Sequence, residues 1–261
     1  MQGGSRERIF GRNAAYEVLR AGRRTVYGLD VAEGAEVRGS LRRVLDLAEA
    51  ESVAVRRVRR AALDCESDSH QGIAATVAPY PYIEIVDILD RAAELSEPPL
   101  VLLLDLIQNP QNLGTLLRTA EAVGVHGVVI GSHRAAGITP AVVSSSSGAS
   151  EHLRIARGNL AQAMDRLRNA GVWMVGLEGG PEAVGPGDVN LAGALGLVVG
   201  NEGEGMRRLV RESCDVLMRL PMRGQVESLN AAVAGSLALY AAWAARGYAG
   251  AGAAQATGGL H

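Results

Sequence analysis

The sequence reads "LVLLLD" at residues 100–105 and, shortly afterwards, "NPQNLGTLLRTAEAVGV" at residues 109–125. The first run is continuously apolar and predicts a strand buried on both faces. In the second run, apolar residues recur at helical spacing from Leu113 onward, and Gly124 is placed to end the helix. A buried strand followed by a helix is the repeating unit of a parallel α/β sheet.

The same alternation of apolar runs and helices continues to residue 246. Further strands are predicted at 127–130, 172–177, 196–200 and 216–220, and helices at 112–123, 160–170, 204–213 and 228–246. Because uninterrupted apolar strands separated by helices need cover on both faces, this pattern indicates a parallel sheet between helices. We assign residues 98–246 to this α/β domain.

The residues before this domain look like a smaller, separate α/β unit over 1–78. Its predicted elements are helices at 13–22 and 39–52 and short strands at 53–58 and 72–78. Prolines bound the segment 79–97, which holds one amphipathic helix and is predicted to be a linker. The small, Gly-rich tail, 247–261, is predicted to be flexible.

The composition fits a compact globular protein and bears on its cellular compartment. Of 261 residues, 48% are hydrophobic, but no apolar run reaches the roughly 20 residues of a membrane span. No signal-peptide core follows the charged start "MQGGSRERIF". Cys65 and Cys214 are far apart in the sequence, which is typical of reduced cytosolic thiols. These features predict a cytoplasmic protein, and the 5 histidines, which show no ligand spacing, predict no metal.

The charge pattern bears on a nucleic-acid partner. All 26 basic residues are arginine, and the net charge is −2. A near-neutral chain is expected to bind RNA weakly where no specific contacts form. Arginine nevertheless binds phosphate through paired hydrogen bonds and stacks on bases. The densest basic run, "RRVRR" at 56–60, is either a solvated face or an RNA contact, and the sequence leaves both interpretations open.

Three stretches follow strands of the predicted sheet: 109–125, "GNEGEGM" at 200–206 and "LPMRGQVESLN" at 220–230. Ligands of open parallel sheets bind beyond the carboxyl ends of the strands, so we expect the three stretches to converge on one crevice. The glycines of the second stretch allow a backbone to approach a ligand closely. Neither a G-x-G-x-x-G turn after the first strand nor a G-K-[ST] motif is present, which argues against a nucleotide-dependent dehydrogenase or a P-loop enzyme.

Taken together, "NPQNLGTLLRTAEAVG", "LVVGNEGEGM" and "LPMRGQVESLNAAVA" resemble the three motifs of the SpoU (TrmH-type) RNA ribose 2′-O-methyltransferases of the SPOUT superfamily, in the right order. The resemblance covers residues 98–246. In addition, "IFGRNAAYEVLRAG" and "HQGIAA" resemble the substrate-binding domain, related to a ribosomal-protein fold, that precedes the catalytic domain in the rRNA-modifying members.

The resemblance implies a deep trefoil knot that holds S-adenosylmethionine mostly through backbone groups. It also implies a homodimer in which both subunits complete each active site. The positions that it implies for the cofactor are Gly200, Leu220, Met222 and Leu229. The positions that it implies for the reaction on RNA are Asn112, Arg118, Glu202, Ser228 and Asn230.

Several of these positions also have a purely structural interpretation. Asn112 is a candidate N-cap of its helix, and Arg118 could form a surface salt bridge with Glu121. Glu202 could be a solvated loop acid, and Ser228 could cap the last helix. The sequence alone does not decide between the structural and the functional roles.

The chemistry of a guanidinium limits what Arg118 can do. A guanidinium is almost never deprotonated, since its pKa exceeds about 12. We therefore interpret Arg118 as a group that binds the phosphate beside the target ribose and stabilises the developing alkoxide, rather than as a general base. The proton of the hydroxyl would then leave to water, to a phosphate oxygen or to Glu202.

Two further segments give structural expectations. The last predicted helix carries the small residues Ala231, Ala234, Gly235 and Ala238, which suit either a packed core or a dimer interface. The run "SSSSGASEH" at 144–152 is predicted to be a flexible loop that faces RNA.

The leading prediction is an S-adenosylmethionine-dependent 2′-O-methyltransferase of large-subunit rRNA, most like the enzymes that act on a guanosine. Three alternatives stay open: a resistance-type enzyme acting on adenosine or uridine of the same rRNA, a tRNA methyltransferase, and a non-catalytic RNA-binding assembly factor. The N-terminal domain argues against the tRNA members, which lack it. The intact side chains of the motifs argue against the non-catalytic factor.

Overall fold

The computed structural model describes residues 5–226 and 228–252 and divides into two compact units. The N-terminal unit comprises the described residues up to Pro81 together with 109–118 and 136–152. The sheet unit comprises 82–108, 119–135 and the described residues from Leu153 onward. Segments from the middle of the sequence therefore complete the N-terminal unit, so the chain passes between the units more than once.

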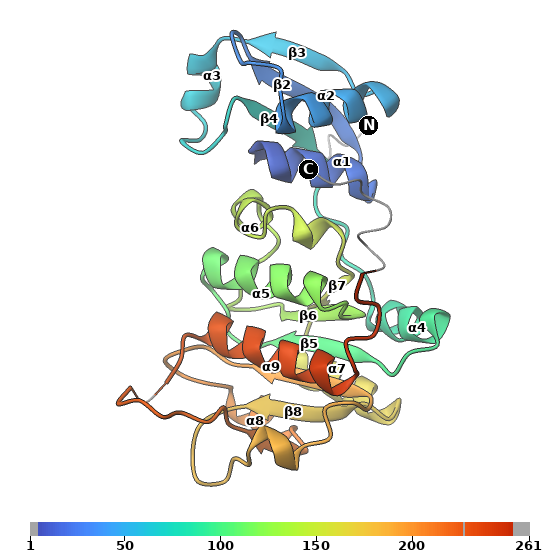
Figure 1. Cartoon of the computed structure of the whole chain (residues 1–261), viewed down its shortest axis with the longest axis vertical. Helices are drawn as coiled ribbons and strands as arrows, with labels where there is room; N and C mark the ends of the chain where they lie inside the picture. The colour runs from blue at the N-terminus through green and yellow to red at the C-terminus, as the bar shows by residue number, and fades with distance from the viewer. Residues whose placement is uncertain (1–4, 227, 253–261) are drawn as a thin grey trace. The chain divides into compact units, whose positions relative to one another are not determined.

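The sheet unit is built on a parallel sheet of six strands, in the order β10-β8-β9-β5-β6-β7 (Figure 1). The strands are β5 (Leu100–Leu104), β6 (Gly127–Gly131), β7 (Ile155–Gly158), β8 (Trp173–Leu177), β9 (Leu195–Val199) and β10 (Val216–Met218). Every residue of β5 is buried, since β6 and β9 flank it. The predicted parallel sheet is confirmed, whereas β7, a short edge strand reading "IARG", was not predicted.

Helices cover this sheet on both faces. They are α4 (Ile85–Leu95), α7 (Leu160–Asn169), α8 (Arg208–Glu212) and α9 (Ala231–Ala245). Side chains of α4, α7 and α8 form one apolar core with alternate residues of the strands, and α9 contacts β8 and β9. The helix in the predicted linker therefore packs in the sheet unit: Ile88 of α4 is fully buried, and a Cβ at Gly127 would lie 2.5 Å from it.

Helices α5 and α8 do not begin where the sequence predicted. Helix α5 (Pro110–Ala122) begins earlier because Asn109, whose Oδ1 accepts from the backbone N–H of Gln111, caps it at 2.8 Å. Asn112 therefore lies inside the helix, and the prediction that it is the N-cap is wrong. Helix α8 begins at Arg208 and not at 204, because the glycine-rich loop extends to that point.

Helix α9 is capped by Asn230 and not by Ser228, which corrects the second N-cap prediction. The Asn230 Oδ1 accepts from the backbone N–H groups of Ala232 and Val233 at 2.9 and 3.1 Å. Two of the orphan donors at the start of the helix are thereby satisfied by one side chain.

The small residues of α9 face its own unit. Ala231, Gly235 and Ala238 are buried, so the packed-core interpretation of these positions holds for one side of the helix. The opposite side leaves Leu237 and Tyr240 exposed, at 51% and 47%. No described helix is long and apolar enough to cross a membrane. The predicted tail, 247–261, is described only to residue 252, and its remainder lies outside the described residues.

The N-terminal unit contains a four-stranded sheet in the order β1-β4-β2-β3. Its elements are β1 (Glu7–Phe10), α1 (Arg12–Ala21), β2 (Val26–Ala32), α2 (Ser40–Ala50), β3 (Val55–Val58), α3 (Arg60–Asp64) and β4 (Ile73–Val77). Only β2 and β3 run parallel. Strands β1 and β2 and helix α3 were not predicted. In β2 the buried Asp30 obscures the pattern, and its charge is matched by Arg8 and Arg56.

The predicted serine loop is wrong. Residues Pro140–Ser145 form helix α6, and Ala149–Glu151 form the short helix η1. Ser146 and Ser150 are fully buried, so this segment is part of the interior. Helix α6 meets the first turns of α5 at Gly114, where an added Cβ would lie 2.1 Å from the Ser145 Oγ.

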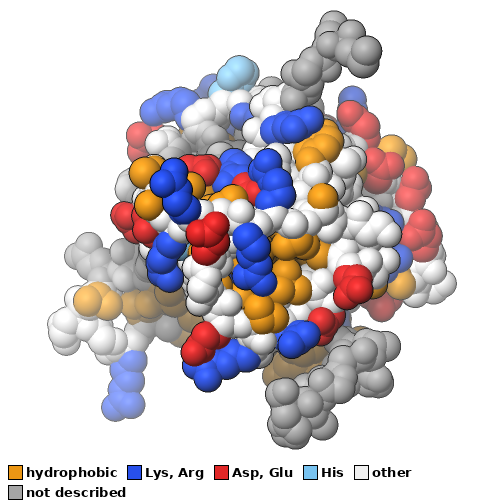
Figure 2. Space-filling model, turned by 90° about the horizontal axis from the view of Figure 1, so that it is seen from above, with side chains coloured by type: hydrophobic (Ala, Val, Ile, Leu, Met, Phe, Trp, Pro, Cys, Tyr) orange, Lys and Arg blue, Asp and Glu red, His pale blue; other side chains and the backbone are white. Residues whose placement is uncertain are grey.

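The basic run at 56–60 lies on β3, which is an edge strand, and at the start of α3. Its arginines are exposed. Arg56 is paired with Asp30, and Arg60 lies 3.9 Å from Asp64. Figure 2 shows arginine and acidic side chains interspersed over the face that it views, so this face is not one continuous basic field. An RNA contact at this run stays a prediction.

Candidate active site

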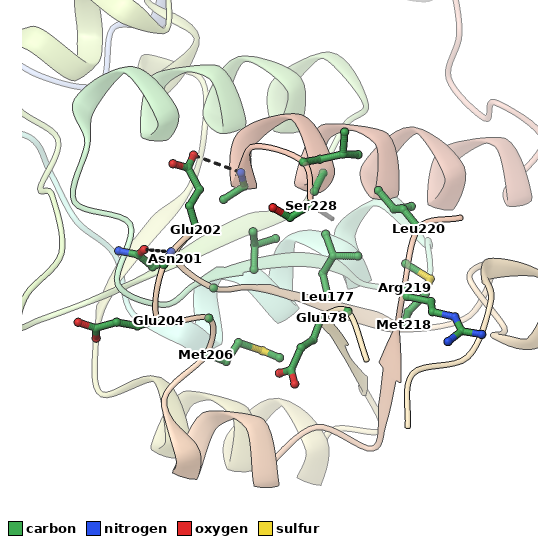
Figure 3. Close-up of a pocket in the computed structure, with 18 of the residues that line it drawn as sticks. Leu177, Glu178, Asn201, Glu202, Glu204, Met206, Met218, Arg219, Leu220 and Ser228 are labelled. Atoms are coloured by element: carbon green, nitrogen blue, oxygen red, sulfur yellow. Dashed lines mark hydrogen bonds between the residues drawn. The ribbon is translucent and has the colours of Figure 1, made fainter. Parts of the chain in front are cut away.

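A cavity of about 500 Å³ opens at the carboxyl ends of the strands of the sheet unit (Figure 3). Its walls come from the ends of β8, β9 and β10, from the loop 200–206, from the chain between β10 and α9, and from the first turn of α9. The volume lies within the range of roughly 300–1,000 Å³ that is typical of small-molecule sites. The position is the one at which parallel sheets bind ligands.

All four positions predicted for the cofactor line this cavity: Gly200, Leu220, Met222 and Leu229. Of the five positions predicted to act on RNA, Glu202 and Ser228 line it too. Two of the three stretches singled out in the sequence therefore meet around one cavity. The roles of these residues stay predictions.

Gly200 is the point at which the loop 200–206 turns back on itself. A Cβ at this position would lie 2.4 Å from the backbone carbon of Gly205 and 2.5 Å from the nitrogen of Met206, so no side chain fits. Asn201 and Gly205 exchange two backbone hydrogen bonds of 3.0 Å across the loop. Gly200 is therefore required for the loop to pack on itself, and the glycines of the loop line the cavity.

The side chain of Asn201 fixes the loop from inside. Its Oδ1 accepts from the N–H of Gly203 at 2.7 Å, and its Nδ2 donates to the carbonyl of Leu106 at 3.2 Å. The second bond ties the loop to the chain that follows β5. Asn201 was not among the predicted site residues, although an Asn in a glycine-rich turn is a common signal for such side-chain bonds.

An ion pair between the buried Asp105 and the partly exposed Arg207 holds the far end of the same loop. Asp105, whose side chain is fully buried at the end of β5, accepts from the backbone N–H of Arg207 at 2.7 Å and from its Nε at 2.8 Å. Arg207 is the residue immediately before α8. This pair was also missed. The sequence signal for it is an acid at the carboxyl end of a buried strand, where a charge needs a partner.

Glu202 and Asn230 are brought into direct contact. The Asn230 Nδ2 donates to the Glu202 Oε1, and the N–H of Ala231 donates to the same oxygen at 3.3 Å. The Glu202 carboxylate thus lies at the N-terminus of α9, where the helix dipole favours negative charge (Figure 3). Asn230 has two functions here, since it caps the helix with its oxygen and orients Glu202 with its nitrogen.

Glu178 also lines the cavity and is held by Arg211. The Arg211 Nε donates to the Glu178 Oε1 at 2.9 Å, and its Nη2 donates to the Glu182 Oε2 at 2.7 Å. The hydrogen bond to Glu182, followed by the one to Glu178, raises the pKa of Arg211 above its ordinary value. Glu178 was not predicted, because nothing in the neighbouring sequence marks it as more than the first loop residue after β8.

Asn112 and Arg118 belong to the N-terminal unit, on the first turns of α5, whereas Glu202, Ser228 and Asn230 belong to the sheet unit. Arg118 is exposed, and its Nη1 donates to the Ser147 Oγ at 3.3 Å. In the part of the chain that the structure describes, its partner is thus Ser147 and not Glu121. Among the described residues, no group of three or more His, Cys, Asp or Glu side chains is placed to bind a metal.

Comparison with known proteins gives the family. Residues 99–240 match the SpoU rRNA Methylase family, and residues 8–83 match the family described as RNA 2′-O ribose methyltransferase substrate binding. A TrmH family tRNA/rRNA methyltransferase of Bacillus subtilis, YacO, is 43% identical over 235 residues, which are 89% of this chain and 93% of YacO. The chain therefore belongs to the SpoU family and is an RNA methyltransferase.

Solved structures agree with this assignment. The SpoU methyltransferase AviRb of Streptomyces viridochromogenes, in complex with its cofactor S-adenosylmethionine, has a TM-score of 0.76 at 25% identity, over 93% of this chain and 91% of AviRb. A protein described as an RNA 2′-O ribose methyltransferase has a TM-score of 0.74 at 27% identity, over 92% of this chain and 89% of that protein. The predicted family and enzyme class are confirmed, and S-adenosylmethionine is confirmed as the cofactor of the family.

Proposed function

We propose that this enzyme transfers a methyl group from S-adenosylmethionine to the ribose 2′-hydroxyl of a guanosine in large-subunit rRNA. The observation that carries the proposal is that Gly200, Leu220, Met222, Leu229 and Glu202 all line the same cavity. The substrate-binding match at residues 8–83 supports a ribose target. It also supports dividing the chain into an RNA-binding domain, 1–78, and a methyltransferase domain, 98–246.

The residues around the cavity fit this cofactor. Leu177, Met206 and Met218 offer apolar surface suited to a purine, and Gly200 brings main chain into the wall of the same cavity. The carboxylate of Glu178 suits a molecule that carries a sulfonium and an ammonium group. When bound, S-adenosylmethionine supplies a methyl group activated by its positive sulfur.

The protein's part in the reaction is positioning and electrostatic stabilisation. A bond forms between the ribose 2′-oxygen and the methyl carbon while the carbon–sulfur bond breaks, and the hydroxyl loses its proton. We assign to Arg118 the binding of the adjacent phosphate and the stabilisation of negative charge on the 2′-oxygen. The proton acceptor is water, a phosphate oxygen or Glu202, whose carboxylate Asn230 orients. Correct placement of the reactants contributes several kcal/mol by intramolecular analogies, on the order of 7–11.

The proposal includes a homodimer and a trefoil knot, as the family resemblance implies. The exposed side of α9, with Leu237 and Tyr240, supports a contact with a second copy of the chain. Light scattering of the wild type and of Leu237→Arg tests this part. A dimer that becomes a monomer supports it, whereas a wild-type monomer contradicts it. We further propose that the enzyme acts in the cytoplasm during rRNA processing.

The target is tested with tritiated S-adenosylmethionine, unmodified rRNA and tRNA, followed by alkaline hydrolysis. A methylated ribose cannot attack its own phosphate, so label persists in alkali-resistant dinucleotides whose composition names the base. We expect label in an rRNA dinucleotide that contains guanosine, and loss of that label with Arg118→Ala.

The other outcomes of this experiment separate the alternatives. Adenosine or uridine in the labelled dinucleotide identifies a resistance-type enzyme. Label in tRNA alone contradicts the inference from the N-terminal domain. Absence of cofactor binding, measured by calorimetry, contradicts the methyltransferase proposal and supports a non-catalytic RNA-binding factor.

A further inference from the structure

A buried ion pair fixes the segment 146–152, which follows α6, to the N-terminal part of its own unit. The side chains of Arg24 and Glu151 are each 1% exposed. The Arg24 Nε donates to the Glu151 Oε2 at 2.8 Å, and its Nη2 donates to the Oε1 of the same carboxylate. The Nη1 of Arg24 donates to Glu7 on β1 at 2.8 Å. One guanidinium therefore joins the sheet of this unit to a segment far away in sequence.

In this ion pair, the charges of Arg24 and Glu151 match each other and the hydrogen bonds of both side chains are satisfied. Burial alone would lower the pKa of Arg24, but its hydrogen bond to Glu151 raises the pKa above the ordinary value. The Tyr80 hydroxyl donates to the carbonyl of Ser150 at 3.0 Å, and burial raises the pKa of Tyr80. A buried ion pair contributes little net stability compared with apolar side chains of equal volume. What it does provide is one defined geometry, since any other arrangement leaves a charge unpaired.

Helix α1 contacts the same segment at a second place. His152 Nε2 lies 2.7 Å from the Glu17 Oε2. At Gly148, whose φ is +85°, an added Cβ would lie 2.5 Å from the Cβ of Glu17. The backbone at Gly148 therefore packs directly against α1, which leaves this turn little freedom to shift.

Ser147 lies between these two anchors and has an unusual backbone. Its φ is +54°, in the left-handed region that residues other than glycine rarely adopt. Its hydroxyl accepts the hydrogen bond from the Arg118 Nη1. Backbone strain most often serves a function where rigid neighbours hold the strained residue and where that residue bonds to a functional side chain. Ser147 meets both conditions.

We propose that the segment 146–152 is a positioning element that the N-terminal unit holds in place, and that Ser147, Glu151 and Arg24 orient the Arg118 guanidinium for the phosphate of the RNA. This inference rests on the role proposed above for Arg118. It extends that role, because the N-terminal unit, which contains the predicted RNA-binding domain, then also orients the Arg118 side chain that acts on the ribose. None of the three touches the reacting atoms by this account, so they are positioning residues.

The first test is a series at position 147, measured as single-turnover methyl transfer at saturating RNA and cofactor. Ser147→Gly removes the hydroxyl but suits the positive φ, so we expect an unchanged melting temperature and a rate about tenfold lower. Ser147→Asn, which tolerates the left-handed region and restores an acceptor, should recover most of the rate. Ser144→Ala is the matched control, because Ser144 shows no side-chain hydrogen bond in the described chain. Wild-type rates in Ser147→Gly overturn the proposal.

A second measurement does not depend on activity. The Nε–H signal of Arg118, identified by its loss in Arg118→Lys, is followed by nitrogen-15 relaxation in the full-length protein. We expect an ordered signal in the wild type, and increased motion in Ser147→Gly and in Glu151→Gln. The exposed Glu49 on α2 gives the control Glu49→Gln, which should leave the signal ordered.

The two measurements separate this inference from the proposed function. If Arg118 keeps the same order in all variants, the positioning role is wrong even where methyl transfer is observed. If Arg118 loosens as expected while the wild type methylates no RNA, the positioning role stands and the proposed reaction fails.

Discussion

The buried carboxylate of Asp105 binds both the main chain and the side chain of Arg207, and so closes the glycine-rich loop at its far end. Gly200 and Asn201 begin the loop, and Arg207 follows it. The ion pair thus anchors one end of the loop that forms a wall of the cavity, and the shape of the loop is set by the end of β5 as well as by its own glycines.

Asp105→Asn should therefore weaken both the fold and cofactor binding. The amide keeps one oxygen for the N–H of Arg207, but its NH₂ group then faces the guanidinium. Because Arg207 is partly exposed, its charge can be resolvated, and we expect a loss of roughly 1–3 kcal/mol in the free energy of unfolding. Urea denaturation and calorimetry with S-adenosylmethionine measure the two effects. The exposed pair of Asp165 and Arg168 gives the control Asp165→Asn, expected within about 0.5 kcal/mol of wild type.

Gly200→Ala tests whether the tight packing of the loop 200–206 on itself is needed for cofactor binding. The added methyl would lie within 2.6 Å of three backbone atoms, so the loop must open for it to fit. We expect cofactor affinity to fall at least tenfold, measured by calorimetry. Gly187→Ala is the matched control, since a Cβ there meets nothing within 4 Å. Equal affinities in the two variants would show that the loop is free to adjust.

The two functions of Asn230 can be separated by substitution. Asn230→Ala removes the cap and should lower the free energy of unfolding by about 1 kcal/mol. Asn230→Ser keeps a capping oxygen but loses the donor to Glu202, so stability should stay near wild type while single-turnover methyl transfer slows. Ser228→Ala leaves the cap intact, and its unfolding curve should match that of the wild type. A fully active Asn230→Ser would exclude a role for the contact with Glu202.

His126 should make stability depend on pH. Burial lowers the pKa of His126 below its ordinary value, and its Nδ1 accepts from the N–H of Leu100 at 2.9 Å. Glu97, 3.2 Å from the Nε2, and Arg246 are the charged groups near it. The neutral form is favoured in the folded state, so this stabilisation is present above the unfolded pKa of about 6.5 and is lost as pH falls through the folded pKa.

The measurement is the free energy of unfolding between pH 7.5 and 5. His126→Asn keeps an acceptor at the Nδ1 position and should remove a slope of at most about 1.4 kcal/mol per pH unit. The exposed His133 gives the control His133→Asn, which should keep the wild-type slope. An identical slope in both variants would assign the pH dependence to other groups.

Much of the sheet unit could be predicted because its strands are buried on both faces. A run such as "LVLLLD" has no polar interruption, so length and composition alone identify it. Strand β2 escaped prediction because its charged Asp30 is neutralised by arginines from other strands, which local sequence cannot reveal. The serine segment was misread for the same kind of reason. Serines suggest a solvated loop, but Ser146 and Ser150 bond to one another within a buried turn.

The candidate site was predicted from the family motifs and not from local physics. Glycines and polar residues after strands identified the region, whereas the individual positions came from the resemblance. The supports of the site were missed. Asp105, Asn201 and Glu178 act through partners that are close only in the folded chain, so no spacing along the sequence marks them.

The contact of α5 with α6 restricts what position 114 can become during evolution. A methyl at Gly114 would lie 2.1 Å from the hydroxyl oxygen of Ser145 and also 2.8 Å from its backbone carbon. A smaller side chain at 145 therefore removes only part of the overlap, because the backbone of α6 stays in the way. Lineages of this family that keep this helix contact should keep glycine at 114, whatever residue stands at 145.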